Sequence, residues 1–167
     1  MVETPNYLIL GRYNNAELRQ YKNLILVTAM KNKEDTYSVF SLLAKYIFGG
    51  NVEGKKIKMT APVLTSNIRK NNKKMFSMSF IMPKKYKIET LPKPLKNNVI
   101  FEEKKIMKLL VLRFSGNLSD KIKSEKIREL NKILKENKFV PKKIFIMQYN
   151  PPWTISFLRR NEVAAEI

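Results

Sequence analysis

One order of elements, two strands, a helix and two further strands, occurs twice in this chain and constrains the fold more than any other feature. The polar stretch 83–98 separates the two halves, because its prolines fix φ and remove hydrogen-bond donors. The first half has predicted strands at 7–13, 17–21, 24–30, 57–63 and 74–82 and a helix at 36–48, which is one short strand more than the repeated order. The second has predicted strands at 99–105, 106–114, 142–149 and 157–163 and a helix at 119–137.

The length of 167 residues fits one domain, since a chain of this size buries roughly 68–70% of its unfolded surface. We therefore expect a single domain over 1–167, with similar halves at about 7–82 and 99–163. No apolar run reaches the roughly 18–20 residues of a membrane span, and the N-terminus lacks the order of a signal peptide. These features predict a cytoplasmic monomer with no membrane span.

The chain is strongly basic, with a formal net charge of +19 from 33 Lys and Arg against 14 Asp and Glu. Cations gathered on one face would favour a nucleic-acid site, because they release counterions from phosphates. Here the cations are scattered, mostly at turns or among acidic residues. We interpret the excess as a solvated basic surface, and nucleic acid as the disfavoured alternative.

Two residue types are absent, and their absence excludes most common catalytic chemistry. Without Cys there is no disulfide or thiolate, and without His there is no imidazole base or histidine-ligated metal. Asp35 and Asp120 are the only aspartates, which disfavours a clustered calcium or magnesium site. The sequence predicts no metal site and no catalytic residues, and an enzyme is the weakest hypothesis.

The predicted helix 36–48 is apolar around most of its circumference. Its polar residues form a thin stripe of Ser38, Ser41 and Lys45. One sheet contact cannot cover so much apolar surface, so part of the helix is expected to face a groove, a ligand or another chain. The alternative is that segments 7–10 and 91–95 cover it.

The predicted strand 74–82 alternates, so that Phe76, Met78, Phe80 and Met82 share one face. Met59 on a neighbouring segment extends this set. Methionine is flexible and polarizable, which suits it to the lining of a pocket for a flat ligand. Spacing alone favours the simpler interpretation, that these side chains fill the core.

Two long motifs carry a family resemblance. Residues 49–63 read GGNVEGKKIKMTAPV, and residues 149–163 read YNPPWTISFLRRNEV. Their order and wording resemble the SOUL heme-binding protein family, and the likeness extends from about residue 7 to 163. The resemblance implies an α+β fold, with an antiparallel, barrel-like twisted sheet of about eight strands and two helices.

The resemblance also implies a hydrophobic groove that binds heme or another tetrapyrrole, for sequestration or transport, with heme not required for folding. Exposed cations can pair with the two propionates, although each lysine is individually typical of an ordinary surface. The rim candidates are Lys45, Lys55, Lys56 and Lys58. The groove candidates are Phe40, Leu43, Lys45, Tyr46, Met59, Phe76, Met78, Phe80 and Met82.

The chain departs from the family members proposed to hold heme iron through a histidine, because it has none. Tyr37, Tyr46, Met59, Met78, Met82 or a lysine could ligate iron in principle. The simpler expectation is binding by shape and charge, with an affinity near micromolar.

The second motif has a structural interpretation and a functional one. Trp153 is expected to pack against the end of the sheet, and Arg160 and Glu162 share a strand face and are expected to pair. The duplicated order of elements also resembles GyrI-like small-molecule-binding domains, which implies an acidic groove residue for cationic aromatic ligands. Glu162 is the candidate for that role, and a protein partner is a further alternative.

Overall fold

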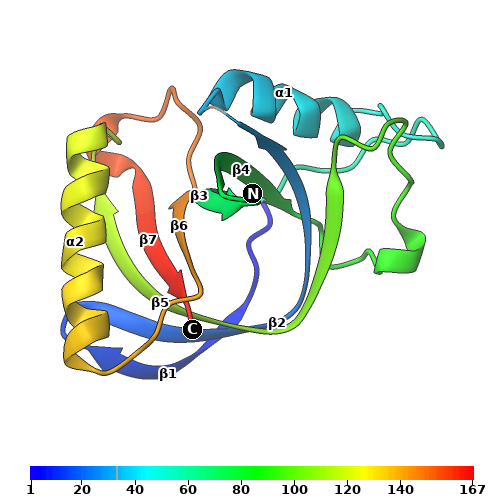
Figure 1. The fold of residues 1–167 in the computed structure, drawn as a ribbon. Coiled ribbons are helices and arrows are strands. Elements are labelled where there is room, and N and C mark those ends of the chain that lie inside the picture. The colour runs from blue at the N-terminus through cyan, green and yellow to red at the C-terminus, as the bar shows by residue number, and fades with distance from the viewer. Residues whose placement is uncertain (33) are drawn as a thin grey trace. The chain divides into compact units, whose positions relative to one another are not determined.

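A computed structural model of the chain describes residues 1–32 and 34–167. Within these residues it contains two α-helices, seven strands and two short 3₁₀ turns (Figure 1). The predicted α+β class, with antiparallel strands and two helices, is confirmed. In chain order the elements are β1 (Tyr7–Tyr13), β2 (Ala16–Lys31), α1 (Thr36–Ile47), β3 (Val63–Lys70), β4 (Lys73–Ile81), η1 (Ile88–Thr90), β5 (Ile100–Ser115), α2 (Asp120–Glu136), β6 (Lys143–Gln148), η2 (Ser156–Leu158) and β7 (Arg160–Glu166).

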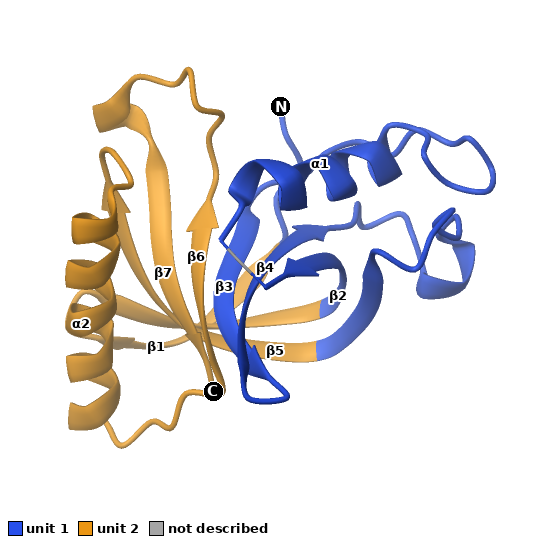
Figure 2. Ribbon diagram, turned by 45° about the horizontal axis from the view of Figure 1, so that its top comes forward, with its two compact units in different colours: residues 1–5, 23–105 blue, residues 6–22, 106–167 orange. Residues whose placement is uncertain are grey.

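The chain divides into two compact units, shown in different colours in Figure 2. Unit 1 comprises residues 1–5 and 23–105, and unit 2 comprises residues 6–22 and 106–167. Strands β2 and β5 each begin in one unit and end in the other. Neither unit is therefore one continuous stretch of sequence.

In unit 1, β4 pairs antiparallel with β3 on one side and with the last residues of β2 on the other. The β3–β4 hairpin turns through Asn71 and Asn72, whose positive φ values of 50° and 61° suit a two-residue turn. Helix α1 packs against β4, where the rings of Phe40 and Phe80 lie 5.5 Å apart. The apolar face of β4 thus meets the buried face of α1 in one core.

In unit 2, β7 pairs antiparallel with β5 and with β6, and β1 pairs with the first residues of β2. Helix α2 packs against β7 and buries Leu130, Ile133 and Leu134. These side chains contact Val163 and other strand residues in a second core cluster. The amphipathic pattern of α2 is satisfied by this single contact.

Two pairs of predicted strands are each one strand in the structure. Segments 17–21 and 24–30 both lie in β2, and segments 99–105 and 106–114 both lie in β5. No Gly or Pro interrupts either strand, and Asn23 takes a positive φ of 53° within β2 without ending it. The division of these stretches into separate strands was wrong, and the described residues contain seven strands against the nine predicted ranges.

The predicted strand 57–63 is also wrong over most of its length. Strand β3 begins at Val63, and the preceding residues make only isolated bridges, at Lys56 and Thr60. The Thr60 hydroxyl donates to the carbonyl of Ile81 at 2.6 Å, and the Ala61–Pro62 peptide bond is cis. Proline lacks the N–H that a strand pairing at this position would use.

Both helices begin at side-chain caps. Asp35 accepts a hydrogen bond from the Ser38 amide at 3.0 Å, and Ser119 accepts one from Ile122 at 3.2 Å. Short polar side chains at these positions satisfy amides that have no partner within the helix. The predicted helix starts are therefore correct to within a residue.

Candidate functional site

Helix α1 ends in a turn that requires glycine at two successive positions. Gly49 has a φ of +106°, and the Gly50 amide donates to the Lys45 carbonyl at 2.8 Å. This bond closes the C-terminus of the helix in a Schellman motif, in which the residue after the cap, Gly49, takes a positive φ. A Cβ on Gly50 would lie only 2.4 Å from the same carbonyl oxygen. The glycine pair of the first motif is thus explained by backbone geometry.

Asn51 holds the segment after this turn against the helix. Its side-chain nitrogen donates to the carbonyls of Tyr46 at 3.1 Å and Lys55 at 2.7 Å. Its side-chain oxygen accepts from the Lys55 amide at 3.0 Å, and its own carbonyl accepts from Gly54 at 3.0 Å. Because Asn51 is buried, these bonds replace those it would make with water. The lysine-bearing segment is therefore fixed in position relative to α1.

Exposed apolar side chains and lysines occur together on α1 and the segment that follows it. The exposed fraction is 83% for Tyr37, 62% for Phe48 and 66% for Val52. Among the described residues, only Lys55 of the four predicted rim lysines has an acidic partner, Glu53 at 3.9 Å. We call this the α1 surface, and it consists of Tyr37, Lys45, Phe48, Val52, Lys55, Lys56, Lys58 and Met59, all exposed.

Most of the predicted groove residues lie in the core of unit 1. Phe40 is partly buried and packs against the same core, while Lys45 and Met59 lie on the α1 surface. The structure therefore brings the predicted set together as two layers, a packed interior and an accessible exterior. Their contact with a ligand stays a prediction. The core members, exposed by 5% or less, are Leu43, Tyr46, Phe76, Met78, Phe80 and Met82.

Tyr46 connects the helix to the proline-rich segment. Its hydroxyl donates to the Pro92 carbonyl at 2.7 Å, and its ring lies 5.5 Å from that of Phe101. Burial, with smaller contributions from the nearby Tyr86 and Glu53, raises the pKa of Tyr46 to about 12. A neutral, hydrogen-bonded tyrosine is a structural support for α1 rather than an anionic iron ligand.

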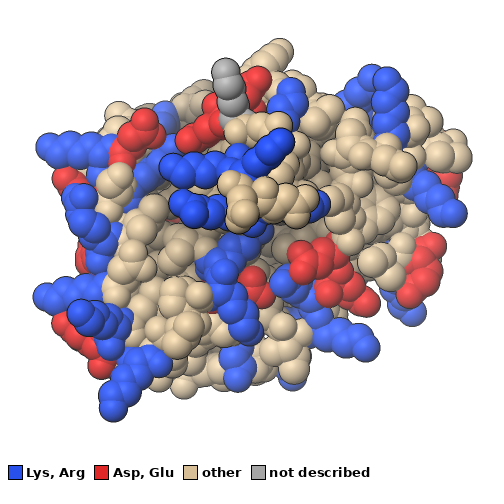
Figure 3. All heavy atoms as spheres, viewed as in Figure 1, with Lys and Arg blue, Asp and Glu red and all other residues tan. Residues whose placement is uncertain are grey.

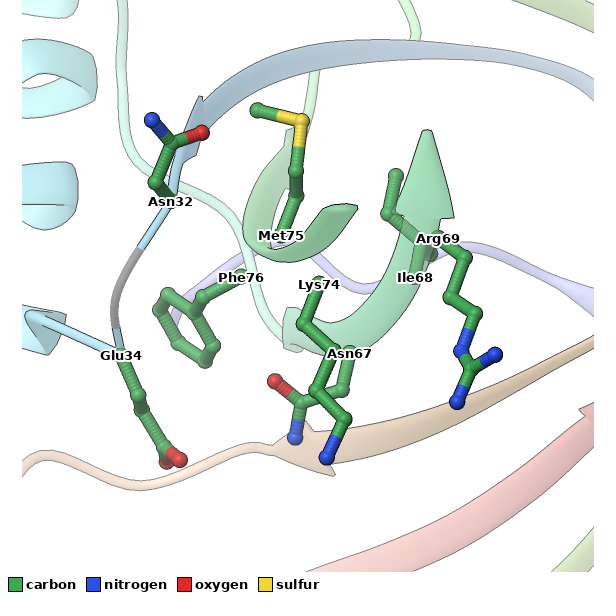
Figure 4. A pocket seen from close by; sticks show the side chains of 8 residues that line it. All are labelled: Asn32, Glu34, Asn67, Ile68, Arg69, Lys74, Met75 and Phe76. Atoms are coloured by element: carbon green, nitrogen blue, oxygen red, sulfur yellow. The ribbon is translucent and has the colours of Figure 1, made fainter. Parts of the chain in front are cut away.

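A pocket of about 450 Å³ lies at the β3–β4 hairpin of unit 1 (Figure 4). Figure 4 shows Asn67, Arg69 and Lys74 on one side of the hairpin and Ile68 and Met75 on the other. Arg69 and Lys74 are cross-strand partners, so both cations lie on one face. This pairing was not predicted from the sequence, although a two-residue turn at Asn71 and Asn72 implies it. The lining residues are Asn32, Glu34, Asn67, Ile68, Arg69, Lys74, Met75 and Phe76.

Glu162 on β7 is fully buried in unit 2, where donors of this chain surround its carboxylate. Arg19 donates to both oxygens, at 3.0 and 3.1 Å. Arg160 donates to Oε1 at 2.7 and 3.0 Å, and the Tyr149 hydroxyl donates to Oε2 at 2.8 Å. The predicted pairing of Arg160 with Glu162 is present. Five hydrogen bonds use the acceptor capacity that a cationic ligand would need.

The groups around Glu162 have pKa values displaced by burial and charge. Burial and the negative charge of Glu162 both raise the pKa of Tyr149, which stays neutral. Burial lowers the pKa of Arg19, but the charge of Glu162 and neighbouring hydrogen bonds outweigh it, so the net shift is upward. Burial also raises the pKa of Tyr21, whose buried hydroxyl has no geometrically satisfied hydrogen bond to any described residue. The negative charge of Glu162 is therefore balanced by the arginines of the cluster and is not exposed as an acidic site.

Arg19 is the member of this cluster that sequence reasoning missed. It lies 143 positions from Glu162, and a lone arginine on a strand gives no local sign of burial. Likewise, nothing in the sequence indicates that the nearby Glu17 pairs with Arg19, at 2.9 Å, and with Arg12, at 2.6 Å. Only the pairing of distant strands brings these charges together.

The described residues contain neither a metal-binding cluster nor a membrane-spanning helix. Among them, no three His, Cys, Asp or Glu side chains lie close enough together to hold a metal ion. Within residues 1–32 and 34–167, no helix is both long and apolar enough to cross a bilayer.

Comparison with known sequences gives a family match over nearly the whole chain. The model of the family described as SOUL heme-binding protein matches residues 2–166. Human heme-binding protein 2 is 32% identical over 128 residues, which are 73% of this chain and 60% of that protein. The aligned region thus spans less than two thirds of the human relative.

Solved structures share the fold at low identity. The crystal structure of the EcmrR C-terminal domain has a TM-score of 0.64 and 13% identity, and each chain covers 96% of the other. A structure of SAV2435 bound to tetraphenylphosphonium has a TM-score of 0.54 and 14% identity, covering 90% of this chain and 92% of that one. At these identities the likeness concerns the fold alone.

Proposed function

We propose that this chain binds heme or a related tetrapyrrole and sequesters or carries it, because it belongs to the SOUL heme-binding protein family. The family match over residues 2–166 is the observation that carries the proposal. The human relative is aligned over only 60% of its length, so what that protein binds is an expectation for this chain.

The α1 surface is the proposed binding face. A porphyrin is a flat apolar ring with two carboxylates at one edge, so it needs an apolar face beside cations. Phe48 and Val52 offer the apolar contact, and Lys45, Lys55 and Lys56 offer charges to the propionates. The core Met and Phe residues support this surface from beneath through the packing of α1 on β4.

The donor set of the chain fits a tetrapyrrole held mainly by shape and charge. The chain contains no His or Cys, and Met78 and Met82 are buried in the core. Met59, which is 38% exposed, is the sulfur-bearing member of the α1 surface. An iron-free porphyrin should therefore bind about as well as hemin.

Hemin titration tests the proposal directly. We expect a saturable change in the Soret band with an affinity near micromolar, as for a partly exposed ligand without a strong iron bond. Protoporphyrin IX should bind within about threefold of hemin, and its dimethyl ester, which lacks both carboxylates, roughly five- to tenfold more weakly. No saturable change at tens of micromolar would contradict tetrapyrrole binding.

Charge-reversal variants test the location. Lys45→Glu combined with Lys56→Glu should weaken hemin binding by roughly tenfold, since two favourable contacts become repulsive. Lys132→Glu combined with Lys135→Glu on the outer face of α2 makes the same change in net charge and serves as the control. Equal losses in both double variants would exclude the α1 surface as the specific site.

The alternative function, binding of a hydrophobic cation at Glu162, is tested with tetraphenylphosphonium. In this structure Glu162 accepts hydrogen bonds from three residues of the chain itself. Its carboxylate therefore has little remaining capacity to pair with a cationic ligand. We expect no saturable binding of tetraphenylphosphonium while hemin binds. Saturable binding by the wild type would favour the alternative, and its loss in a Glu162→Gln variant shown by circular dichroism to be folded would assign it to Glu162.

A further inference from the structure

The loop between β6 and β7 exposes four large apolar side chains. The exposed fraction is 84% for Trp153, 59% for Ile155, 71% for Phe157 and 61% for Leu158. The expectation that Trp153 packs against the end of the sheet is therefore wrong. We call residues 153–158 the apolar loop, and the α1 surface includes none of them.

The apolar loop is held in one conformation by its own hydrogen bonds. The Arg159 side chain donates to the carbonyls of Thr154 at 2.7 Å and Pro152 at 2.5 Å, and to the Asn117 side chain at 3.2 Å. A 3₁₀ turn over Ser156–Leu158 adds a bond from the Leu158 amide to the Ile155 carbonyl at 3.0 Å. A fixed backbone that projects apolar side chains reduces the entropy lost on docking.

Hydrogen bonds also join the two strand ends at the base of the loop. The Arg160 amide donates to the Asn150 side chain at 2.7 Å, and the Tyr149 amide donates to the Arg160 carbonyl at 3.2 Å. The guanidinium of Arg160 lies 3.9 Å from the centre of the Tyr149 ring and also contacts Glu162. The loop is thus anchored on the buried charge cluster of unit 2.

The residue types in the apolar loop suit a bilayer interface. Tryptophan is enriched at the level of lipid headgroups, and Phe, Leu and Ile contribute apolar area that inserts roughly 5–10 Å into the boundary region. Several large apolar side chains gathered on one exposed turn differ from isolated surface leucines, which need no explanation. The loop is too short to span a membrane, so any such contact is peripheral.

The net charge of the chain specifies the kind of lipid. Arg159 and Arg160 follow the loop directly and bond to groups of the chain itself, while Lys138, Lys142 and Lys143 precede or begin β6, at the opposite end of that strand from the loop. The whole chain carries a net charge of +19, and Figure 3 shows Lys and Arg outnumbering Asp and Glu on the visible face. A basic protein surface is attracted to anionic headgroups at about 1 kcal/mol for each nearby cation.

We propose that the apolar loop inserts into the headgroup region of an anionic lipid bilayer, while the net positive charge of the chain attracts the protein to its surface. Apolar insertion and electrostatic attraction are the two signals that together give stable peripheral binding. The proposal is independent of tetrapyrrole binding, since it concerns a different surface and is tested without heme.

Trp153 is the only tryptophan in the chain, so its fluorescence reports on the loop alone. The full-length protein is mixed with vesicles of phosphatidylcholine, with or without phosphatidylserine. We expect co-sedimentation and a shift of Trp153 emission to shorter wavelength only when phosphatidylserine is present. Lipids brominated near the headgroup end of the acyl chain should quench that emission more than lipids brominated near the chain terminus.

Variants of equal charge separate insertion from simple adsorption. Phe157→Ser combined with Leu158→Ser should weaken vesicle binding by roughly tenfold and abolish the emission shift. Val140→Ser is the control, because Val140 is 80% exposed but precedes β6, at the opposite end of that strand from the apolar loop. It should bind as the wild type does.

Three outcomes would overturn the proposal. Binding without an emission shift, equal in the double variant and the wild type, would mean electrostatic adsorption alone. Equal binding to neutral vesicles would remove the role of anionic lipid. The absence of any vesicle binding would leave a protein partner as the occupant of the apolar loop.

Discussion

The guanidinium of Arg19 and the carboxylate of Glu162 lie 3.0 Å apart, and their side chains are only 4% and 0% exposed. Removing Glu162 leaves the buried Arg19 with Glu17 as its acidic partner, and breaking a buried pair costs about 3–5 kcal/mol. Glu162→Gln should therefore lower the free energy of unfolding by that amount, measured by urea denaturation. Arg12→Ala, which removes a partly exposed pair with Glu17, should cost below about 1 kcal/mol.

Glu17 should make part of the stability dependent on acid pH. Partial burial acts to raise the pKa of its carboxyl, but hydrogen bonds and charges from Arg19 and Arg12 outweigh burial and lower it. A lowered pKa adds stability that is present above the ordinary value of 4.5 and lost as pH falls below it. Denaturation curves at several acidic pH values should show a smaller decline for Glu17→Gln than for the wild type. Parallel declines would exclude Glu17 as a contributor.

The raised pKa of Tyr46 predicts that the protein loses stability at alkaline pH. In the unfolded chain a tyrosine loses its proton near pH 10, whereas in the folded protein Tyr46 keeps it until about pH 12. Because the unfolded state binds fewer protons in this window, stability falls as pH rises through it. Tyr46→Phe should show a shallower alkaline decline, with a loss of about 1 kcal/mol at neutral pH from the missing bond to Pro92.

Gly50 and Gly54 provide a matched pair of backbone tests. A Cβ at Gly50 would overlap the Lys45 carbonyl, so Gly50→Ala should cost more than about 2 kcal/mol by forcing the end of α1 to move. At Gly54 there is open space, and only its φ of +61° opposes a side chain. Gly54→Ala should cost about 1 kcal/mol, measured by thermal unfolding. Equal costs would mean that close approach to α1 is not the reason for Gly50.

Alanine variants of Met78 and Met59 distinguish the effect of core packing on stability from the effect of ligand contact on hemin affinity. Met78 is 2% exposed, so Met78→Ala should lower stability by about 2–5 kcal/mol. Met59 is 38% exposed, so Met59→Ala should change stability by less than about 0.5 kcal/mol. If the proposed surface binds hemin, Met59→Ala should weaken hemin binding several-fold at unchanged stability, measured by titration. A stable Met59→Ala with unaltered affinity would remove Met59 from the surface.

Local patterns predicted the elements whose causes are local. The caps at Asp35 and Ser119, the glycine turn after α1 and the apolar face of α2 all follow from residues within a few positions of one another. The alternation of β4 likewise predicted a shared face for Met78 and Phe80. These features depend on short-range backbone and side-chain chemistry.

The remaining errors arose where distant segments decide the outcome. The burial of Arg19 depends on a partner 143 residues away, and the exposure of Trp153 depends on bonds from Arg159 that pull the loop backbone inward. The continuity of β5 from Ile100 to Ser115 could not be inferred from its charged residues 102–105, since no local hydrophobic pattern joins its two ends. The motif around Pro62 resembled a strand in composition, but its amides bond elsewhere, Ile57 to the carbonyl of Ile47 and Ala61 to that of Glu3, and β3 begins only at Val63.

The passage of β2 and β5 through both units has a consequence for any attempt to divide the molecule. A cut in the proline-rich segment 83–98 separates the apparent sequence halves, yet each fragment would contain only part of either unit. The N-terminal fragment would keep Arg19 and lose Glu162, and the C-terminal fragment the reverse. We therefore expect neither half to fold alone, and a mixture of the two to regain structure only by complementation.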